Sequence, residues 1–204
     1  TGTGWFIDER GWIITNGHVV QPAHEPPRWL VNQQALRAVA TACLPAALAK
    51  RGIAPGERPD VEDQIRRRLL DVVLPTTKVK VSPRVTVLVS SGARLKAEGK
   101  KYSPPASPQP GVMSGRDLAL LRVPGERFPV LPLAESRGVK IGDPIHILGY
   151  PGVVLSHELL NQSASLEASV TNGAVSGFKE DVEGQAVIQT DAPAAWGNSG
   201  GPAV

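Results

Sequence analysis

Segments rich in β-branched and aromatic residues, bounded by glycine, proline or polar turns, recur along most of this 204-residue chain and constrain its fold more than any other feature. The first two, Trp-Phe-Ile and Trp-Ile-Ile-Thr, flank a polar turn at residues 8–11 and predict a hairpin within residues 2–20. From residue 78 onward, polar and apolar residues alternate as they do in strands. The 21 glycines and 19 prolines also suit many short elements joined by turns. The chain is therefore predicted to be mainly β.

Residues 21–75 depart from this pattern and predict a helical insertion. Residues 29–51 are rich in alanine and leucine and are followed by glycine and proline, which end helices. A second helix is predicted over residues 60–74, with Asp60 as its N-cap and Pro75 beyond its end. Together the two helices form a hairpin inserted between two β elements. The apolar positions of the second helix follow helical spacing and are Val61, Ile65, Leu69, Val72 and Val73.

Composition excludes several classes of function. The 22 Lys and Arg residues against 19 Asp and Glu give a net charge of +3, too small and too dispersed to indicate a nucleic-acid partner. No run of residues approaches the about 20 apolar residues of a membrane-spanning helix. The single cysteine, Cys43, cannot form an intramolecular disulfide and is predicted to be a small buried side chain. No metal site and no cofactor are expected.

The sequence Gly-Asn-Ser-Gly-Gly-Pro at residues 197–202 presents one hydroxyl on a glycine-flanked turn, so Ser199 is the candidate nucleophile. A serine hydroxyl reacts only when a base removes its proton and preplaced donors receive the oxyanion. The candidate base, His18, directly follows the second predicted strand, and the candidate acid, Asp117, opens an apolar strand after a loop predicted over residues 99–115. Alone, His18 is more simply a core histidine and Asp117 a turn residue. Their occurrence together with Ser199 favours catalytic roles.

The order His18, Asp117, Ser199 is that of the chymotrypsin-type triad. The chain resembles the trypsin-like fold and, within it, the bacterial HtrA/Deg type of serine protease. The resemblance covers most of residues 2–20 and 84–204. Its blocks are Gly-Thr-Gly-Trp-Phe-Ile-Asp with Gly-Trp-Ile-Ile-Thr-Asn-Gly-His-Val-Val, Asp-Leu-Ala-Leu-Leu-Arg-Val, Gly-Asp-Pro-Ile-His-Ile-Leu-Gly-Tyr-Pro-Gly, Ser-Val-Thr-Asn-Gly-Ala-Val-Ser, and Gln-Thr-Asp-Ala with Gly-Asn-Ser-Gly-Gly-Pro.

The resemblance implies two antiparallel β-barrels with the active site in the cleft between them. Residues 1–130 are expected to form the first barrel, interrupted by the helical insertion at about residues 21–75. Residues 131–204 are expected to form the second. The family continues with further strands where this sequence stops at Val204, so the second barrel is expected to be incomplete at its C-terminal end.

The resemblance also assigns roles to the site residues. His18 acts as general base and then general acid, Asp117 fixes its tautomer, and Ser199 forms the acyl-enzyme. The backbone N–H groups of Gly197 and Ser199 form the oxyanion hole. The residues expected at the base of the primary pocket include no carboxylate, so a small or medium apolar side chain is expected at the cleavage position. These pocket residues are Ala192, Pro193, Ala194 and Ala195.

Two neighbouring residues qualify this picture. Pancreatic-type proteases carry an aspartate where this chain has Asn198, and that aspartate pairs with a newly cut N-terminus. Activation by that route is therefore not expected here. Trp196 either narrows the pocket entrance or packs on the barrel, and the sequence does not separate the two interpretations.

The leading interpretation of function is a serine endopeptidase that acts on unfolded or exposed polypeptide. A protease-like peptide-binding module, inactive or gated by the helical insertion, is the main alternative, and a serine esterase is another. The insertion follows His18 closely and is a candidate surface for a regulatory partner or a second copy of the chain, although a neutral surface insertion is equally consistent with the sequence. The resemblance implies a location in the cell envelope, either periplasmic or secreted.

Overall fold

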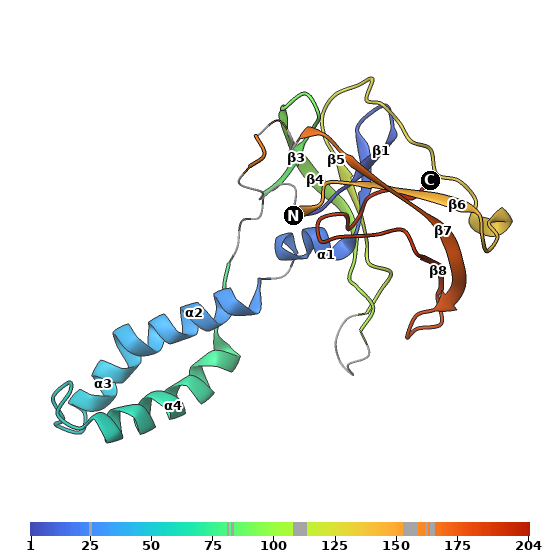
Figure 1. Cartoon of the computed structure of the whole chain (residues 1–204). Helices are drawn as coiled ribbons and strands as arrows, with labels where there is room; N and C mark the ends of the chain where they lie inside the picture. Colours follow the sequence, from blue (N-terminus) through green and yellow to red (C-terminus); the bar gives the residue numbers. More distant parts are fainter. Residues whose placement is uncertain are drawn as a thin grey trace. The chain divides into compact units, whose positions relative to one another are not determined.

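The chain folds into two compact units, one built of strands and one of helices (Figure 1). The β unit comprises Thr1–Gln21 and Arg84–Val204, and the helical unit comprises Pro22–Pro83. The mainly β class with a helical insertion is thereby confirmed. The computed structural model describes residues 1–24, 26–80, 82, 84–107, 114–152, 159–161, 163 and 166–204.

A five-stranded antiparallel sheet forms the first half of the β unit, in the order β1-β2-β5-β4-β3. Its first two strands form the predicted hairpin, closed by a turn in which the Gly11 N–H donates to the Asp8 carbonyl at 3.2 Å. The predicted loop over residues 99–115 is wrong at its start, because β4 continues through Ser103 and pairs with β5. The strands are β1 (Trp5–Asp8), β2 (Trp12–Thr15), β3 (Val85–Leu88), β4 (Arg94–Ser103) and β5 (Leu118–Arg122).

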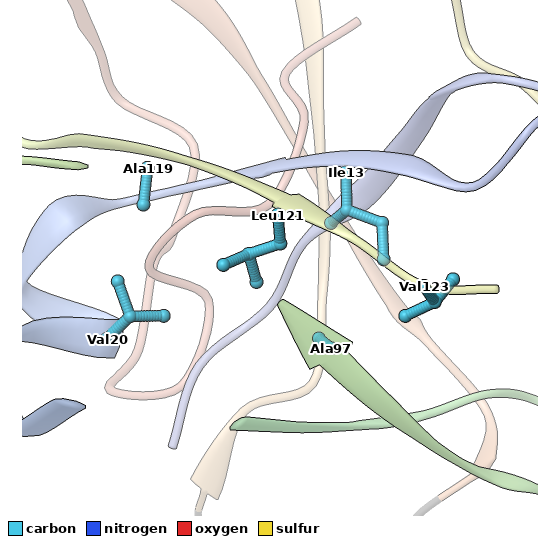
Figure 2. Packing of buried hydrophobic residues seen from close by; sticks show 6 residues of the cluster. All are labelled: Ile13, Val20, Ala97, Ala119, Leu121 and Val123. Atoms are coloured by element: carbon cyan, nitrogen blue, oxygen red, sulfur yellow. The ribbon is translucent and has the colours of Figure 1, made fainter. Parts of the chain in front are cut away.

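The core of this sheet follows from strand alternation. In β2 and β5 every second residue is buried, because successive side chains of a strand point to opposite faces. Figure 2 shows these side chains converging from β2, β4, β5 and the short helix after β2. Phe6 and Phe128 pack against the core with stacked rings whose centroids are 4.3 Å apart. The buried cluster consists of Ile13, Val20, Ala97, Ala119, Leu121 and Val123.

A second antiparallel sheet, in the order β6-β7-β8, forms the other half of the β unit (Figure 1). It contains β6 (Pro144–Gly149), the long curved β7 (Ser169–Glu180) and β8 (Ala186–Thr190). The last residues of the chain return to β6, where Val204 exchanges two backbone hydrogen bonds with His146 at 2.7 and 2.9 Å. The segment that holds Ser199 therefore runs from the end of β8 back onto β6. The barrel boundary near residue 130 stays a prediction.

The helical unit has its own core. Its first helical segment runs from α2 (Arg28–Ala38) through a π-helical turn (Val39–Cys43) into α3 (Leu44–Ala49), and α4 (Pro59–Thr76) returns alongside it. The side chains buried between them are Val39, Leu44, Leu48 and Ile65.

Four details of the insertion differ from the sequence expectation. The helix α4 begins at Pro59 rather than after an Asp60 cap, because proline at a first helical position leaves no N–H unpaired. It also continues past Pro75 to Thr76. Val72 is 68% exposed, and Leu70 packs toward the core instead. Cys43 is half-buried rather than fully buried.

Candidate active site

His18 lies in α1 (Gly17–Val20), a one-turn helix that directly follows β2. Gly17 permits this helix to lie against the end of β4, since a Cβ at Gly17 would stand 2.1 Å from the Ser103 carbonyl oxygen. The side chain of Val20 anchors the other end of α1 in the core. The His18 side chain remains 42% exposed just beyond the end of β2. A short, firmly packed helix thus presents an accessible imidazole.

Asp117 immediately precedes β5 and has an unusual backbone conformation. Its φ of +50° lies in the left-handed region, which aspartate tolerates better than most residues. Its N–H donates to the Pro104 carbonyl at 2.9 Å, and its own carbonyl accepts from the Asn16 side-chain amide at 2.9 Å. These contacts fix the turn that directs the carboxylate toward α1.

The carboxylate of Asp117 holds His18 by two hydrogen bonds across 99 residues of sequence. One oxygen accepts the backbone N–H of His18 at 2.8 Å, and the other lies 2.8 Å from Nδ1 of the ring. An ionised carboxylate only accepts, so this contact places the proton of a neutral imidazole on Nδ1 and leaves Nε2 as the acceptor. The geometry thus prepares Nε2 to take a proton from a neighbouring group.

Ser199 lies in a loop, residues 196–199, in which every backbone carbonyl accepts a hydrogen bond. The N–H and C=O of a trans peptide point in opposite directions, so a fixed carbonyl also fixes the direction of the next N–H. Within the described chain, the N–H groups of Gly197 and Ser199 donate to no acceptor. Two donors are therefore held in place and left available. The carbonyls accept as follows: Trp196 from Gly152 N at 2.6 Å, Gly197 from Thr3 Oγ1 at 2.7 Å, Asn198 from Gly201 N at 2.8 Å, and Ser199 from Thr3 N at 2.8 Å.

Glycines at both sides of Ser199 permit this loop to pack against backbone. Gly197 has a φ of +105°, and a Cβ there would stand 2.4 Å from the Tyr150 carbonyl oxygen. Gly200 has a φ of +84°, and a Cβ there would stand 2.2 Å from Thr15 Oγ1. Both conformations favour glycine, and both sites lack space for a side chain.

The Ser199 loop lies beside the helix that carries His18. A Cβ on Gly2 would stand 2.5 Å from a methyl carbon of Val19 and 2.9 Å from the Ser199 carbonyl oxygen. The structure thus joins His18 and Asp117 directly and places the Ser199 carbonyl near Val19, the residue after His18. In the part of the chain described here, no hydrogen bond links the Ser199 hydroxyl to the His18 ring. Such contacts are often long in an unliganded active site and tighten when substrate binds.

The predicted pocket residues divide into one buried and three exposed positions. Ala192 is buried, and its N–H donates to Thr190 Oγ1 at 3.0 Å. Residues 193–195 are exposed, and the Pro193 carbonyl accepts from Thr171 Oγ1 at 2.7 Å. Trp196 contacts Gly152 but remains 74% exposed. The assignment of these residues to a substrate pocket stays a prediction.

Three residues that contact the site received no role from the sequence. Thr3 binds the Ser199 loop, Asn16 binds the Asp117 backbone, and Ser103 lies against Gly17. The Gly-Thr-Gly around Thr3 belongs to the first block of the resemblance, and it is the one signal that pointed to this segment. Among the described residues, no group of three His, Cys, Asp or Glu side chains is arranged to hold a metal, and no helix is long and apolar enough to span a membrane.

Comparisons with known proteins identify relatives of this chain. The family model of the trypsin-like peptidase domain matches residues 69–204, which include Asp117 and Ser199. A Halomonas elongata protein named "Probable periplasmic serine endoprotease DegP-like" is 28% identical over 204 residues, or 98% of this chain and 26% of that protein. A protein of the same name from Pseudomonas fluorescens is 34% identical over 89 residues, or 42% of this chain and 16% of that protein. A solved structure of the HtrA-type protease AlgW with decapeptide matches at a TM-score of 0.53 and 18% identity, over 100% of this chain and 39% of that one.

The fold and the family match together define the class: the chain belongs to the trypsin-like peptidase family. Within that family it is an HtrA/Deg-like member of the bacterial type. The chain spans about a quarter or less of the length of the two bacterial relatives.

Proposed function

We propose that this chain is the catalytic unit of a serine endopeptidase, with His18, Asp117 and Ser199 as its triad. The observation that carries the proposal is the double hydrogen bond from the Asp117 carboxylate to the backbone and ring of His18. It fixes both the orientation and the tautomer that a general base needs. The adjacent Ser199 loop, with two unused N–H donors, supplies the remaining parts.

In the proposed reaction, Ser199 Oγ bonds to the carbonyl carbon of the scissile peptide while its proton passes to Nε2 of His18. The carbonyl oxygen becomes an oxyanion and accepts from the N–H groups of Gly197 and Ser199. When the C–N bond breaks, Nε2 gives its proton to the leaving amine, and an acyl-enzyme remains. Water then attacks this ester by the same route, releasing the acid and restoring Ser199.

We propose unfolded or exposed polypeptide as the substrate and the cell envelope, periplasmic or secreted, as the location. Two relatives are named periplasmic serine endoproteases, and the AlgW structure contains a decapeptide, which supports both proposals. The lack of a carboxylate at positions 192–195 of the sequence supports our proposal of a small or medium apolar side chain at the cleavage position.

Cleavage of an unfolded protein by the full-length protein tests the activity. Ser199→Ala should abolish it, since the nucleophile is lost, whereas Ser91→Ala, in an exposed turn of the same unit, should leave it unchanged. Comparing a peptide with its simple ester separates peptidase from esterase. Hydrolysis of the ester alone, or cleavage that survives Ser199→Ala, would overturn the proposal.

A second candidate is a peptide-binding module whose turnover is blocked or gated by the helical insertion, which also remains our candidate surface for a regulatory partner or a second copy. The place of the insertion supports this alternative, since the helical unit begins at Pro22, four residues after His18. Deleting residues 24–74 tests it, because the triad lies wholly in the β unit. The alternative predicts that deletion unmasks cleavage or leaves peptide binding without turnover, whereas unchanged cleavage rules out gating.

A further inference from the structure

We propose that Thr3 is a positioning residue that keeps the loop at residues 196–199 in the conformation that presents the oxyanion donors. The inference rests on the function proposed above. Thr3 does not touch the reacting atoms in that scheme. It acts through the backbone carbonyls of Gly197 and Ser199, to both of which it donates a hydrogen bond.

Thr3 is only 5% exposed, and each of its polar atoms forms a hydrogen bond. Its N–H donates to the Ser199 carbonyl at 2.8 Å, and its hydroxyl donates to the Gly197 carbonyl at 2.7 Å. The same hydroxyl accepts the Tyr150 N–H at 3.0 Å, and the Thr3 carbonyl accepts from Thr15 Oγ1 at 2.6 Å. One residue thereby ties the Ser199 loop to the end of β2 and to the residue after β6.

The two carbonyls that Thr3 binds flank the peptide whose orientation matters. The Ser199 N–H belongs to the peptide between Asn198 and Ser199, and rotation of that peptide would point a carbonyl where the oxyanion must bind. Gly197 gives the loop wide conformational freedom, so the loop needs restraint from outside. Thr3 restrains it on both sides of Asn198.

The chemistry of the side chain explains why a hydroxyl is required. It must donate to one backbone group and accept from another at the same time, which a hydroxyl does and an aliphatic side chain cannot. The Thr3 methyl group faces Gly201, where a Cβ would stand 3.2 Å from it. Serine therefore keeps the required hydrogen bonds and loses only this packing contact, whereas valine keeps the shape and loses both hydrogen bonds.

The test compares Thr3→Val, Thr3→Ser and a control, Val123→Ala, which loosens the core far from residue 3 in the sequence. We measure the rate of Ser199 acylation by a fluorophosphonate, kcat and KM on a peptide ester, and amide hydrogen exchange at Tyr150 and Gly201. Loss of one oxyanion donor lowers kcat by about 10²–10³-fold. We expect Thr3→Val to lower kcat at least about tenfold with KM nearly unchanged, and Thr3→Ser to stay within about threefold of wild type.

Hydrogen exchange separates this inference from the proposed function. Thr3→Val should speed exchange at Tyr150, which loses its acceptor, and at Gly201, whose acceptor is the Asn198 carbonyl of the loosened loop. If exchange is faster in Thr3→Val but the wild type is not acylated, the proposed function is overturned, whereas the restraint of the loop by Thr3 is supported. Wild-type kcat and exchange in Thr3→Val, or an equal loss of kcat in Val123→Ala, would overturn the inference. If Thr3→Val fails to fold, the wild type still tests the inference. A Tyr150 amide that is not protected from hydrogen exchange in the wild type would overturn the inference.

Discussion

At the scale of single residues, Asp117 sets the tautomer of His18. Replacing it with asparagine puts an amide beside Nδ1, and the amide can donate, which favours a proton on Nε2 and removes the base. We expect Asp117→Asn to lower kcat by about 10⁴-fold with little change in stability. Steady-state kinetics on an ester measures this.

Asp143→Asn is the matched control, because Asp143 also accepts a backbone N–H, from Lys140 at 2.8 Å, but in a turn before β6. It should keep wild-type kcat. A loss below about tenfold in Asp117→Asn would contradict the assigned role of Asp117.

Asp8 gives a prediction on pH. Hydrogen bonds from Arg10 lower the pKa of Asp8 from 3.8 to about 2. Between pH 2 and pH 3.8, Asp8 is more often protonated in the unfolded chain than in the folded one. The stability that the ionised Asp8 carboxylate contributes is therefore complete above pH 3.8 and is lost as the pH falls toward 2. Asp8→Asn should lower the urea midpoint slightly at pH 5 and not at pH 2. Equal midpoint differences at both values would contradict this.

The roles of single residues were only partly predictable. The motifs containing His18, Asp117 and Ser199 are local in sequence, and their order identified the triad candidates. Thr3 was missed because its importance lies in hydrogen bonds to backbone atoms about 195 residues away, which no local pattern records.

At the scale of elements, α1 depends on Gly17. A Cβ at residue 17 meets the Ser103 carbonyl oxygen, which is backbone and cannot turn aside. We therefore expect Gly17→Ala to displace α1, lower the free energy of unfolding by about 1–3 kcal/mol and lower kcat as well. Gly138→Ala is the control, since nothing lies within 4 Å of a Cβ there. Denaturant titration and ester hydrolysis measure both effects, and wild-type values in Gly17→Ala would contradict the account.

The helical insertion has a core separate from that of the β unit. Leu48 is 2% exposed within it, so Leu48→Ala should destabilise the insertion by about 2–5 kcal/mol. Hydrogen exchange should rise in α2, α3 and α4 and stay unchanged in β2 and β5. A uniform rise across the strands would show that the two cores do not unfold separately.

Element types were more predictable than element ends. Strand alternation and helical spacing identified the hairpin, the strands from residue 85 onward and both helices of the insertion. The alternation at residues 78–80 was misleading, because these residues form no strand and belong to the helical unit. The ends depended on tertiary contacts: β4 extends to Ser103 because β5 offers hydrogen bonds, and α4 includes Pro75 in its last turn. The exposure of Val72 likewise depends on which side of α4 the first helix covers.

At the scale of the whole molecule, the two sheets of the β unit bring together segments from both ends of the chain. Gly2 and Thr3 lie against the Ser199 loop, and the final residues pair with β6. The mainly β class followed from periodicity, and the trypsin-like fold came from the resemblance. The proposed activity depends on whether these segments assemble a reactive serine.

The most direct measurement is covalent labelling with a fluorophosphonate, followed by mass spectrometry to locate the adduct. A triad built from His18, Asp117 and Ser199 predicts one adduct per chain, on Ser199, lost in Ser199→Ala and strongly slowed in Asp117→Asn. An unlabelled, folded wild-type protein, or an adduct on another serine, would contradict the central claim.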